Sequence, residues 1–178
     1  MIDTHQGEST GKLVVGAFLT LDGVMQAPGG PDEDRDAGFK HGGWMDNYSD
    51  ERMGEIVNDQ FDAADALLLG RKTYEIFASY WPDFEPADNP LAMNLNSMPK
   101  YVASRTLDAV EWRNSTLLVG DVAAAVEDLK NERGDMIMTQ GSADLIQTLL
   151  SYDLVASSGS SPWSSGCSAT GRFPLPSN

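Results

Sequence analysis

The stretch Leu67-Leu68-Leu69-Gly70-Arg71-Lys72-Thr73-Tyr74-Glu75 predicts a buried strand that turns at a glycine into a helix. The first backbone N–H groups of such a helix lack partners, and the helix dipole places positive charge behind them. Arg71 and Lys72 add full charges and Thr73 adds a hydroxyl, so this corner suits a phosphate. Gly70 would tolerate positive φ and would let the phosphate approach the backbone closely. The alternative is an ordinary turn whose basic residues are solvated.

The composition is that of an acidic, single-domain protein. The chain has 178 residues, with 12 basic against 27 acidic side chains and a formal net charge of −15. This length supports one hydrophobic core, and the acidic excess argues against nucleic acid or an anionic membrane as a partner. No apolar run is long enough to span a bilayer, and the polar start lacks a signal-peptide core, so we expect a cytoplasmic protein.

The cysteine and histidine content argues against a metal site. The lone Cys167 excludes an intramolecular disulfide and every multi-cysteine zinc motif. The two histidines, His5 and His41, lie far apart in the sequence, and His41 is interpreted as a surface residue rather than a general acid. We therefore expect no bound metal.

The first strand is predicted from a nearly continuous apolar run over residues 12–20, which is typical of a central strand buried on both faces. It leads into Asp22 and a glycine, where Asp22 would either cap its own backbone or face a ligand. Residues 27–43, rich in Gly, Pro and Asp, predict a long lid or binding loop. Trp44 at its end would cover a ring-shaped ligand or pack on the next helix.

Helices and strands alternate through the rest of the chain. We predict a helix capped by Ser49, a loop over residues 81–96, strands over 66–69, 98–103, 116–119 and 135–140, and helices after 70, 121 and 142. This alternation predicts a mostly parallel α/β sheet, which binds ligands beyond the carboxyl ends of its strands. Four strand ends should therefore face one crevice: Asp22, Gly70, Ser104 and Gly141.

Two more strand exits carry residues suited to phosphate. Arg105 follows Ser104 at the end of one strand, and arginine is the side chain best shaped to bind a phosphate bidentately. Gly141 and Ser142 form another corner between a strand and a helix. The Gly-x-Gly-x-x-Gly dinucleotide fingerprint is absent from the chain.

The order of these signals resembles the dihydrofolate reductase-like fold over residues 11–155: Leu-Asp-Gly at 21–23, Gly-Arg-Lys-Thr-Tyr-Glu at 70–75, Ser-Arg-Thr at 104–106 and Gly-Ser at 141–142. Within this fold the chain is similar to the reductase domain of the bifunctional riboflavin-biosynthesis deaminase–reductase. The zinc-deaminase signature is absent, so the resemblance is to the reductase half only.

The resemblance implies an α/β domain whose central sheet is flanked by helices, and NADPH-dependent hydride transfer to a pteridine- or aminopyrimidine-type ring. The reaction would be similar to that of 5-amino-6-(5-phosphoribosylamino)uracil reductase, with the protein supplying orientation and electrostatics. The alternative is a non-catalytic nucleotide- or pterin-binding module with the same fold. The resemblance allows a homodimer, although nothing in the residues demands one.

The resemblance also implies a role for each matching residue. The cofactor phosphates would be held by Gly70, Arg71, Lys72 and Thr73. The 2′-phosphate of NADPH would lie at Ser104 and Arg105, and the pyrophosphate would approach Gly141 and Ser142. Ala17 and Phe18 would flank the nicotinamide, with Asp22 and Trp44 near the substrate. Asp22 or a held water would protonate the accepting ring.

The two ends of the chain depart from this domain. Residues 1–10 are expected to be a disordered leader. Residues 156–178 hold eight of the sixteen serines, no acidic residue and one basic residue, which predicts a flexible tail. The resemblance implies strands there instead, and back-translation with suitably chosen GC-rich codons, read two bases out of frame, gives an apolar, strand-like ending. This indicates a frameshift near residue 155, which would leave the C-terminal strands missing or altered and a sheet edge open. The alternative is a native tail on a complete fold.

Overall fold

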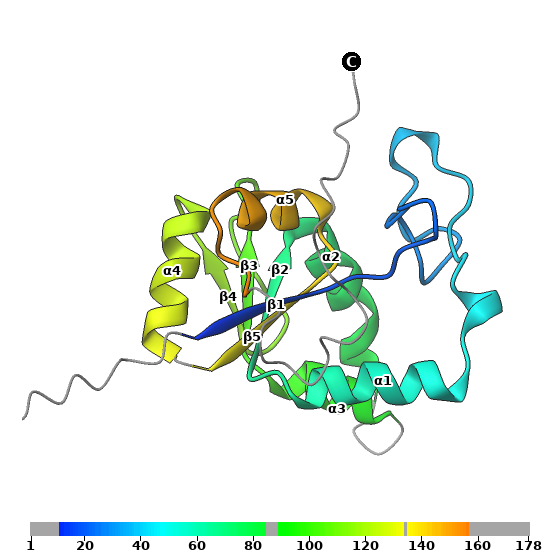
Figure 1. The fold of residues 1–178 in the computed structure, drawn as a ribbon, viewed down its shortest axis with the longest axis horizontal. Helices are drawn as coiled ribbons and strands as arrows, with labels where there is room; N and C mark the ends of the chain where they lie inside the picture. Colours follow the sequence, from blue (N-terminus) through cyan, green and yellow to red (C-terminus); the bar gives the residue numbers. More distant parts are fainter. Residues whose placement is uncertain (1–10, 85–88, 134, 157–178) are drawn as a thin grey trace, which may run out of the picture.

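The chain folds around one parallel β-sheet. The structure, a computed structural model, describes residues 11–84, 89–133 and 135–156. Within them, five strands lie in the order β1-β5-β2-β3-β4, and every neighbouring pair is parallel (Figure 1). The predicted parallel α/β sheet is confirmed, with the strands β1 (Lys12–Gly16), β2 (Ala66–Gly70), β3 (Lys100–Ala103), β4 (Ser115–Leu118) and β5 (Met136–Gln140).

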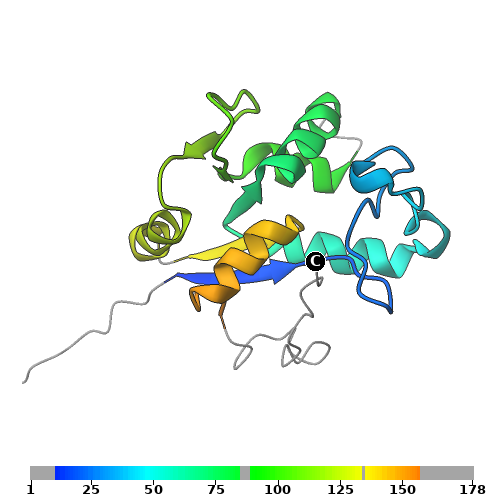
Figure 2. The same cartoon turned by 90° about the horizontal axis from the view of Figure 1, so that it is seen from above.

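Helices cover both faces of this sheet, as Figure 2 shows from above. On one face, α4 (Val122–Arg133) and α5 (Ala143–Ser151) pack against Leu13, Leu68 and Ile137. On the other face, α1 (Glu51–Asp62), α2 (Arg71–Tyr80) and α3 (Pro90–Ser97) pack against Leu67 and Met138. Successive strand residues point to opposite faces, so continuously apolar strands such as β2 supply both cores. Three short 3₁₀ helices complete the described elements: η1 (Asp36–Gly38), η2 (Asp46–Tyr48) and η3 (Trp81–Asp83).

Two boundaries differ from the predictions. β1 ends at Gly16 rather than at residue 20, because the chain then forms a separate turn in which the N–H of Gly23 donates to the carbonyl of Thr20 at 2.9 Å. Helix α1 is capped by Asp50, whose side chain accepts a hydrogen bond from the N–H of Met53 at 2.8 Å. The predicted cap, Ser49, instead donates its hydroxyl to the carbonyl of Met45.

Helix α3 lies where a loop was predicted. Asn89 caps it by accepting hydrogen bonds from the N–H groups of Leu91 and Ala92, and Pro90 occupies the first helical position. The helix has only eight residues, too few to show a periodic apolar pattern, and it forms because Leu95 packs into the core beneath β2 and β3. The signal that could have found it is the Asn-Pro pair, a capping residue followed by a helix-starting proline.

The predictions for both chain ends fall outside the described residues, apart from Ala156. Its N–H donates to the carbonyl of Leu13 at 2.9 Å, so Ala156 lies beside the outer edge of β1. In the described part of the chain β1 and β4 form the two edges of the sheet.

Lys100 is a buried cation without a carboxylate partner among the described residues. Its side chain is fully buried, and its Nζ donates hydrogen bonds to the carbonyls of Leu95 at 2.7 Å and Met98 at 2.8 Å. The ammonium also lies 4.4 Å from the centroid of the Trp112 ring, which offers its negative face to a cation. Burial, assisted by the positive charge of Arg113, lowers the pKa of Lys100 to about 8.

We expect this lysine to make the fold more stable as the pH rises from about 8 towards 10.5. In that interval the unfolded chain still carries the proton that the folded protein has released, so alkali favours the folded state. Burial of the protonated lysine destabilises the fold at lower pH, and the loss of this penalty should raise the free energy of unfolding by about 3 kcal/mol across the interval. Urea unfolding of the wild type and of Lys100→Met across this range measures it. A constant difference in stability between the two proteins would contradict the prediction.

Candidate functional site

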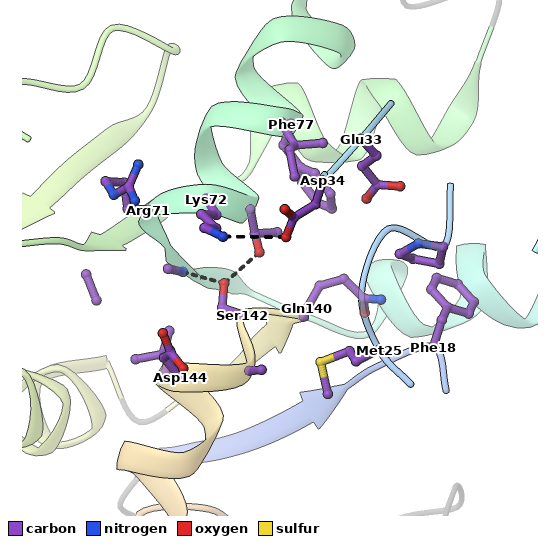
Figure 3. Close-up of a pocket in the computed structure, with 18 of the residues that line it drawn as sticks. Phe18, Met25, Glu33, Asp34, Arg71, Lys72, Phe77, Gln140, Ser142 and Asp144 are labelled. Atoms are coloured by element: carbon purple, nitrogen blue, oxygen red, sulfur yellow. Dashed lines mark hydrogen bonds and ion pairs between the residues drawn. The ribbon is translucent and has the colours of Figure 1, made fainter. Parts of the chain in front are cut away.

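A cleft of about 1200 Å³ opens at the edge of the sheet where the strands end (Figure 3). In a parallel sheet, the helix that follows a strand begins at the edge where that strand ends. The starts of α2, α4 and α5 therefore all line the cleft, together with the exit of β3: Gly70–Thr73, Gly120–Ala123, Gly141–Asp144 and Ala103–Thr106.

The centre of the cleft is the point where two neighbouring strands send their helices to opposite faces. β5 pairs with β2, but α5 packs on one face of the sheet and α2 on the other. Such a reversal opens a crevice at the carboxyl ends of the two strands, which is where open α/β sheets bind ligands. The predicted convergence of strand exits is confirmed for Gly70, Ser104 and Gly141, which all line the cleft.

Ser142 joins the two corners across this crevice. Its hydroxyl accepts a hydrogen bond from the N–H of Gly70 at 2.9 Å and is hydrogen-bonded to the Thr73 hydroxyl at 2.6 Å (Figure 3). Gly141 and Ser142 both have left-handed backbones, with φ of 65° and 64°, which turns the serine towards β2. The β5 corner is thus fixed to the β2 corner by a side chain that sequence reasoning assigned only to a phosphate.

Gly70 packs tightly against the neighbouring corner. Its φ is −77°, an extended conformation that any residue adopts, so the tolerance of glycine for positive φ is not needed here. A Cβ at this position would lie 2.6 Å from the Oγ and 2.7 Å from the Cβ of Ser142. Glycine is therefore needed because the serine of the neighbouring corner packs directly on the backbone.

Basic side chains gather at one end of the cleft, around the start of α2 and the exit of β3. This basic end consists of Arg71, Lys72 and Arg105. Arg71 forms an ion pair with Glu75 one helical turn later, at 2.9 Å. Helix α2 has no side-chain cap, so the N–H groups of its first turn also point to this end without a helical partner.

Lys72 is held by the long loop that precedes α1. It forms an ion pair and hydrogen bond with Asp36 and lies 3.5 Å from the carboxylate of Asp34. The hydrogen bond with Asp36 raises the pKa of Lys72 and, with the lysine's charge, lowers the pKa of Asp36. The loop of residues 27–43 thus lies at the rim of the cleft, as the lid or binding loop expected from its composition would.

The opposite end of the cleft is apolar, with one buried amide. The side chains of this apolar end come from the segment after β1, from α1 and from α2: Phe18, Met25, Met53, Val57, Phe61 and Phe77. Gln140, the last residue of β5, is 9% exposed and extends into the cleft on the side of Phe18 and Met25 (Figure 3). Sequence reasoning missed Gln140, although its place directly before the Gly141 corner was the available signal.

Three of the predicted site residues do not line the cleft. Asp22 is exposed on the turn after β1, where the Thr20 hydroxyl donates to it at 2.5 Å and lowers the pKa of its carboxyl. Trp44 is half-buried and donates its indole N–H to the carbonyl of Gln26 at 3.0 Å, so it fixes the loop. Ala17 also lies outside the lining. Asp22 lies outside because β1 stops at Gly16 and the chain then forms the separate turn that carries this residue.

Two further findings concern metals and membranes. No group of three His, Cys, Asp or Glu side chains in the described ranges is arranged to hold a metal ion. Of the helices that the structure describes, none combines the length and the apolar character needed to cross a membrane. His41 is exposed, as predicted.

Comparison with known proteins identifies one family, through a family model that covers most of the chain. The family model described as the RibD C-terminal domain matches residues 11–157. The uncharacterized protein YyaP of Bacillus subtilis (strain 168) is 28% identical over 147 residues, which cover 81% of this chain and 70% of YyaP. A crystal structure from Shewanella sp. PV-4, provisionally described as a riboflavin biosynthesis protein, has a TM-score of 0.51 at 22% identity, covering 81% of this chain and 72% of that one. At this identity the last comparison shows the shared fold alone.

We expect Ser142→Ala to destabilise the protein by about 1–3 kcal/mol, because the partly buried N–H of Gly70 loses its acceptor. Urea unfolding measures the change. Ser151→Ala is the control, since that hydroxyl is exposed and bonds only within α5, so its effect should stay within about 0.5 kcal/mol. Equal effects of the two substitutions would show that the link between the corners carries no stability.

Gly70→Ala should also destabilise the fold, because its Cβ would overlap the Ser142 side chain. In the Ser142→Gly background this overlap is absent, so the same substitution should cost much less, with a coupling energy of about 1–3 kcal/mol. A double-mutant cycle of unfolding free energies provides the measurement. If Gly70→Ala costs the same in both backgrounds, another constraint fixes the glycine.

Proposed function

Because the chain belongs to the RibD C-terminal domain family, we propose that it is an NADPH-dependent reductase that transfers a hydride to a pteridine- or aminopyrimidine-type ring. The observation that carries this proposal is the division of one cleft into a basic end beside uncapped helix N–H groups and an end lined by aromatic and aliphatic side chains. A dinucleotide phosphate and a ring substrate need those two environments side by side.

The residues of the basic end fit the phosphates of NADPH. The first-turn N–H groups of α2 and the side chains of Arg71 and Lys72 supply donors and charge for the pyrophosphate region. The start of α5, with Gly141 and Ser142, faces the same space from the other side of the crevice. Arg105 at the exit of β3 would bind the 2′-phosphate. Ser104 would contribute to this phosphate site mainly by shaping the turn, since its side-chain oxygen accepts hydrogen bonds from the N–H groups of Thr106 and Leu107.

The apolar end would hold the reacting rings away from bulk water. When bound, NADPH would supply the hydride, and the protein would supply orientation. Phe18, at the exit of β1, would contact the nicotinamide, and the side chains of α1 and α2 would enclose the accepting ring. Because Asp22 lies outside the cleft, a held water is the proton source that this geometry supports.

The alternative, a module that binds the same ligands without turnover, is favoured by one observation. The loop carboxylates that line the cleft already have partners. Glu33 accepts hydrogen bonds from the N–H groups of Gly29 and Gly30. Asp34 and Asp36 form ion pairs with Lys72. None of these three is therefore a ready proton donor to a ring. Turnover has to be measured directly.

Two measurements test the proposal. Thermal unfolding with NADPH at about 100 times its dissociation constant should show a stabilisation of roughly 2.7 kcal/mol. Steady-state oxidation of NADPH is then followed with pterins, flavin precursors and the ribosylaminouracil phosphate as acceptors. Oxidation of NADPH that depends on one acceptor supports the reductase, and binding without oxidation of any acceptor supports the module.

We expect Arg105→Ala to weaken the binding of NADPH far more than the binding of NADH. Loss of a charged hydrogen bond to the 2′-phosphate, which NADH lacks, should cost about 1.5–3 kcal/mol, or roughly a 10- to 150-fold rise in Kd. Cofactor fluorescence titration measures both constants. Arg52→Ala is the matched control, because this arginine pairs with Glu55 on the surface of α1 and does not line the cleft. If Arg105→Ala weakens the binding of both cofactors equally, Arg105 does not bind the 2′-phosphate.

A further inference from the structure

The two ends of the cleft differ in charge, and from this difference we infer that the apolar end binds an uncharged or cationic ring without a phosphate group, with Gln140 hydrogen-bonding the ring. The inference rests on the proposed function, whose substrate class it narrows. It differs from what the resemblance to the riboflavin-biosynthesis reductase implies, since that substrate carries a ribose phosphate.

Positive charge is absent from the apolar end within the described residues. The basic side chains of the lining are Arg71, Lys72 and Arg105, which all come from the start of α2 and the exit of β3. The segments that form the apolar end contribute aromatic, aliphatic and amide side chains but no lysine or arginine to the lining: residues 18–29, α1 and the exit of β5. A phosphate on the substrate would find no cation there.

Negative charge, in contrast, borders the apolar end. Glu33 and Asp34 face the cleft from the long loop, as Figure 3 shows, and Asp36 also belongs to the lining. Lys72, at the start of α2, forms ion pairs with Asp34 and Asp36, which outnumber it. A phosphate dianion here would share a partly enclosed cleft with these carboxylates, and like charges repel more strongly there than in open water. A neutral or cationic molecule meets no such repulsion.

Gln140 supplies the second, independent observation. It is 9% exposed, and its carboxamide makes no hydrogen bond to any described residue, although it extends into the cleft (Figure 3). Side chains alternate along β5, so Gln140 shares the face of Met138, the face covered by α1 and α2. Gly16 on the neighbouring strand leaves the space that the carboxamide occupies, because a Cβ there would overlap its oxygen.

The chemistry of a carboxamide points to the group it would recognise. It donates two hydrogen bonds and accepts through its oxygen, which matches the adjacent N–H and C=O of a ring lactam. The other glutamine of the lining, Gln26, is committed to the loop, with its amide donating to the carbonyls of Asp34 and Asp36. A site built to hydrogen-bond a ring lactam also rejects analogues that lack the matching atoms.

The first test compares two ligands that differ only by a 5′-phosphate group. The binding of 5-amino-6-ribosylaminouracil, with and without its 5′-phosphate, is measured by calorimetry in the presence and absence of NADPH. We expect the unphosphorylated compound to bind at least tenfold more tightly, and raising the salt concentration from 0.05 to 0.5 M to narrow the gap by screening the carboxylates. Equal binding, or preference for the phosphate, would overturn the inference. Failure of both compounds to bind would overturn it too.

The second test concerns Gln140. Gln140→Leu should raise the Kd of the unphosphorylated compound at least tenfold. The Kd of NADPH should stay within twofold of the wild-type value. Gln147→Leu is the matched control, because this glutamine is exposed on α5 and does not line the cleft. Circular dichroism and the melting temperature report whether each variant is folded. A folded Gln140→Leu variant with unchanged ring affinity would remove the glutamine from recognition.

The reductase proposal and the inference of a ring without a phosphate can fail independently. If NADPH does not bind but the unphosphorylated ring still binds more tightly, the reductase proposal falls and the charge inference stands. If NADPH binds and is oxidised only with the phosphorylated compound, the reductase proposal stands and the charge inference falls.

Discussion

Every pair of neighbouring strands in the described sheet is parallel, and this one constraint places the candidate chemistry at a single edge. Parallel strands end together, so the helices that follow them begin together, with their unpaired N–H groups and the positive ends of their dipoles near one another. An antiparallel sheet would send half of these turns to the opposite edge. The cleft therefore follows from strand direction before any individual side chain is considered.

The acidic character of the chain makes the basic end of the cleft the favoured place for an anion. Because the chain has a formal net charge of −15, most of its surface repels a ligand phosphate, which is attracted only where cations are concentrated. The loop carboxylates of Asp34 and Asp36 pair with Lys72 and so limit how far that positive region extends towards the apolar end. A phosphate at the start of α2 would compete with Asp36 for the same ammonium. The loop and a bound anion are thus alternative partners of one lysine.

Sequence patterns predicted the corners but not how they touch each other. The strand–glycine–helix signal at Gly70 and at Gly141 is local, and both corners form as predicted. The hydroxyl of Ser142 on the Gly70 backbone joins residues 72 positions apart, which no local pattern encodes. Asp22 failed as a cleft residue because an apolar run does not show where a strand stops pairing, and the chain leaves β5 after Gly16. Gln140 carries no motif, and its place in the cleft depends on how β5 packs beside Gly16 of β1.

The position of the basic end is set by a buried polar network that lies away from the cleft. The hydroxyl of Tyr74 on α2 accepts hydrogen bonds from the N–H groups of Glu111 at 2.9 Å and Trp112 at 3.0 Å. The indole of Trp112 donates to Asn96 at 2.7 Å and stacks on the Lys100 ammonium, whose hydrogen bonds reach carbonyls at and just beyond the end of α3, where a cation is favoured.

The segment that carries Arg105 therefore begins at β3 and ends on Tyr74, one helical turn after the Arg71 corner. Both of its ends are attached beside the Arg71 corner, because β3 pairs with β2 and the N–H groups of Glu111 and Trp112 donate to Tyr74 on α2. Because Tyr74, Trp112 and Lys100 are all buried, this arrangement is maintained by the core rather than by the exposed ion pairs of the cleft.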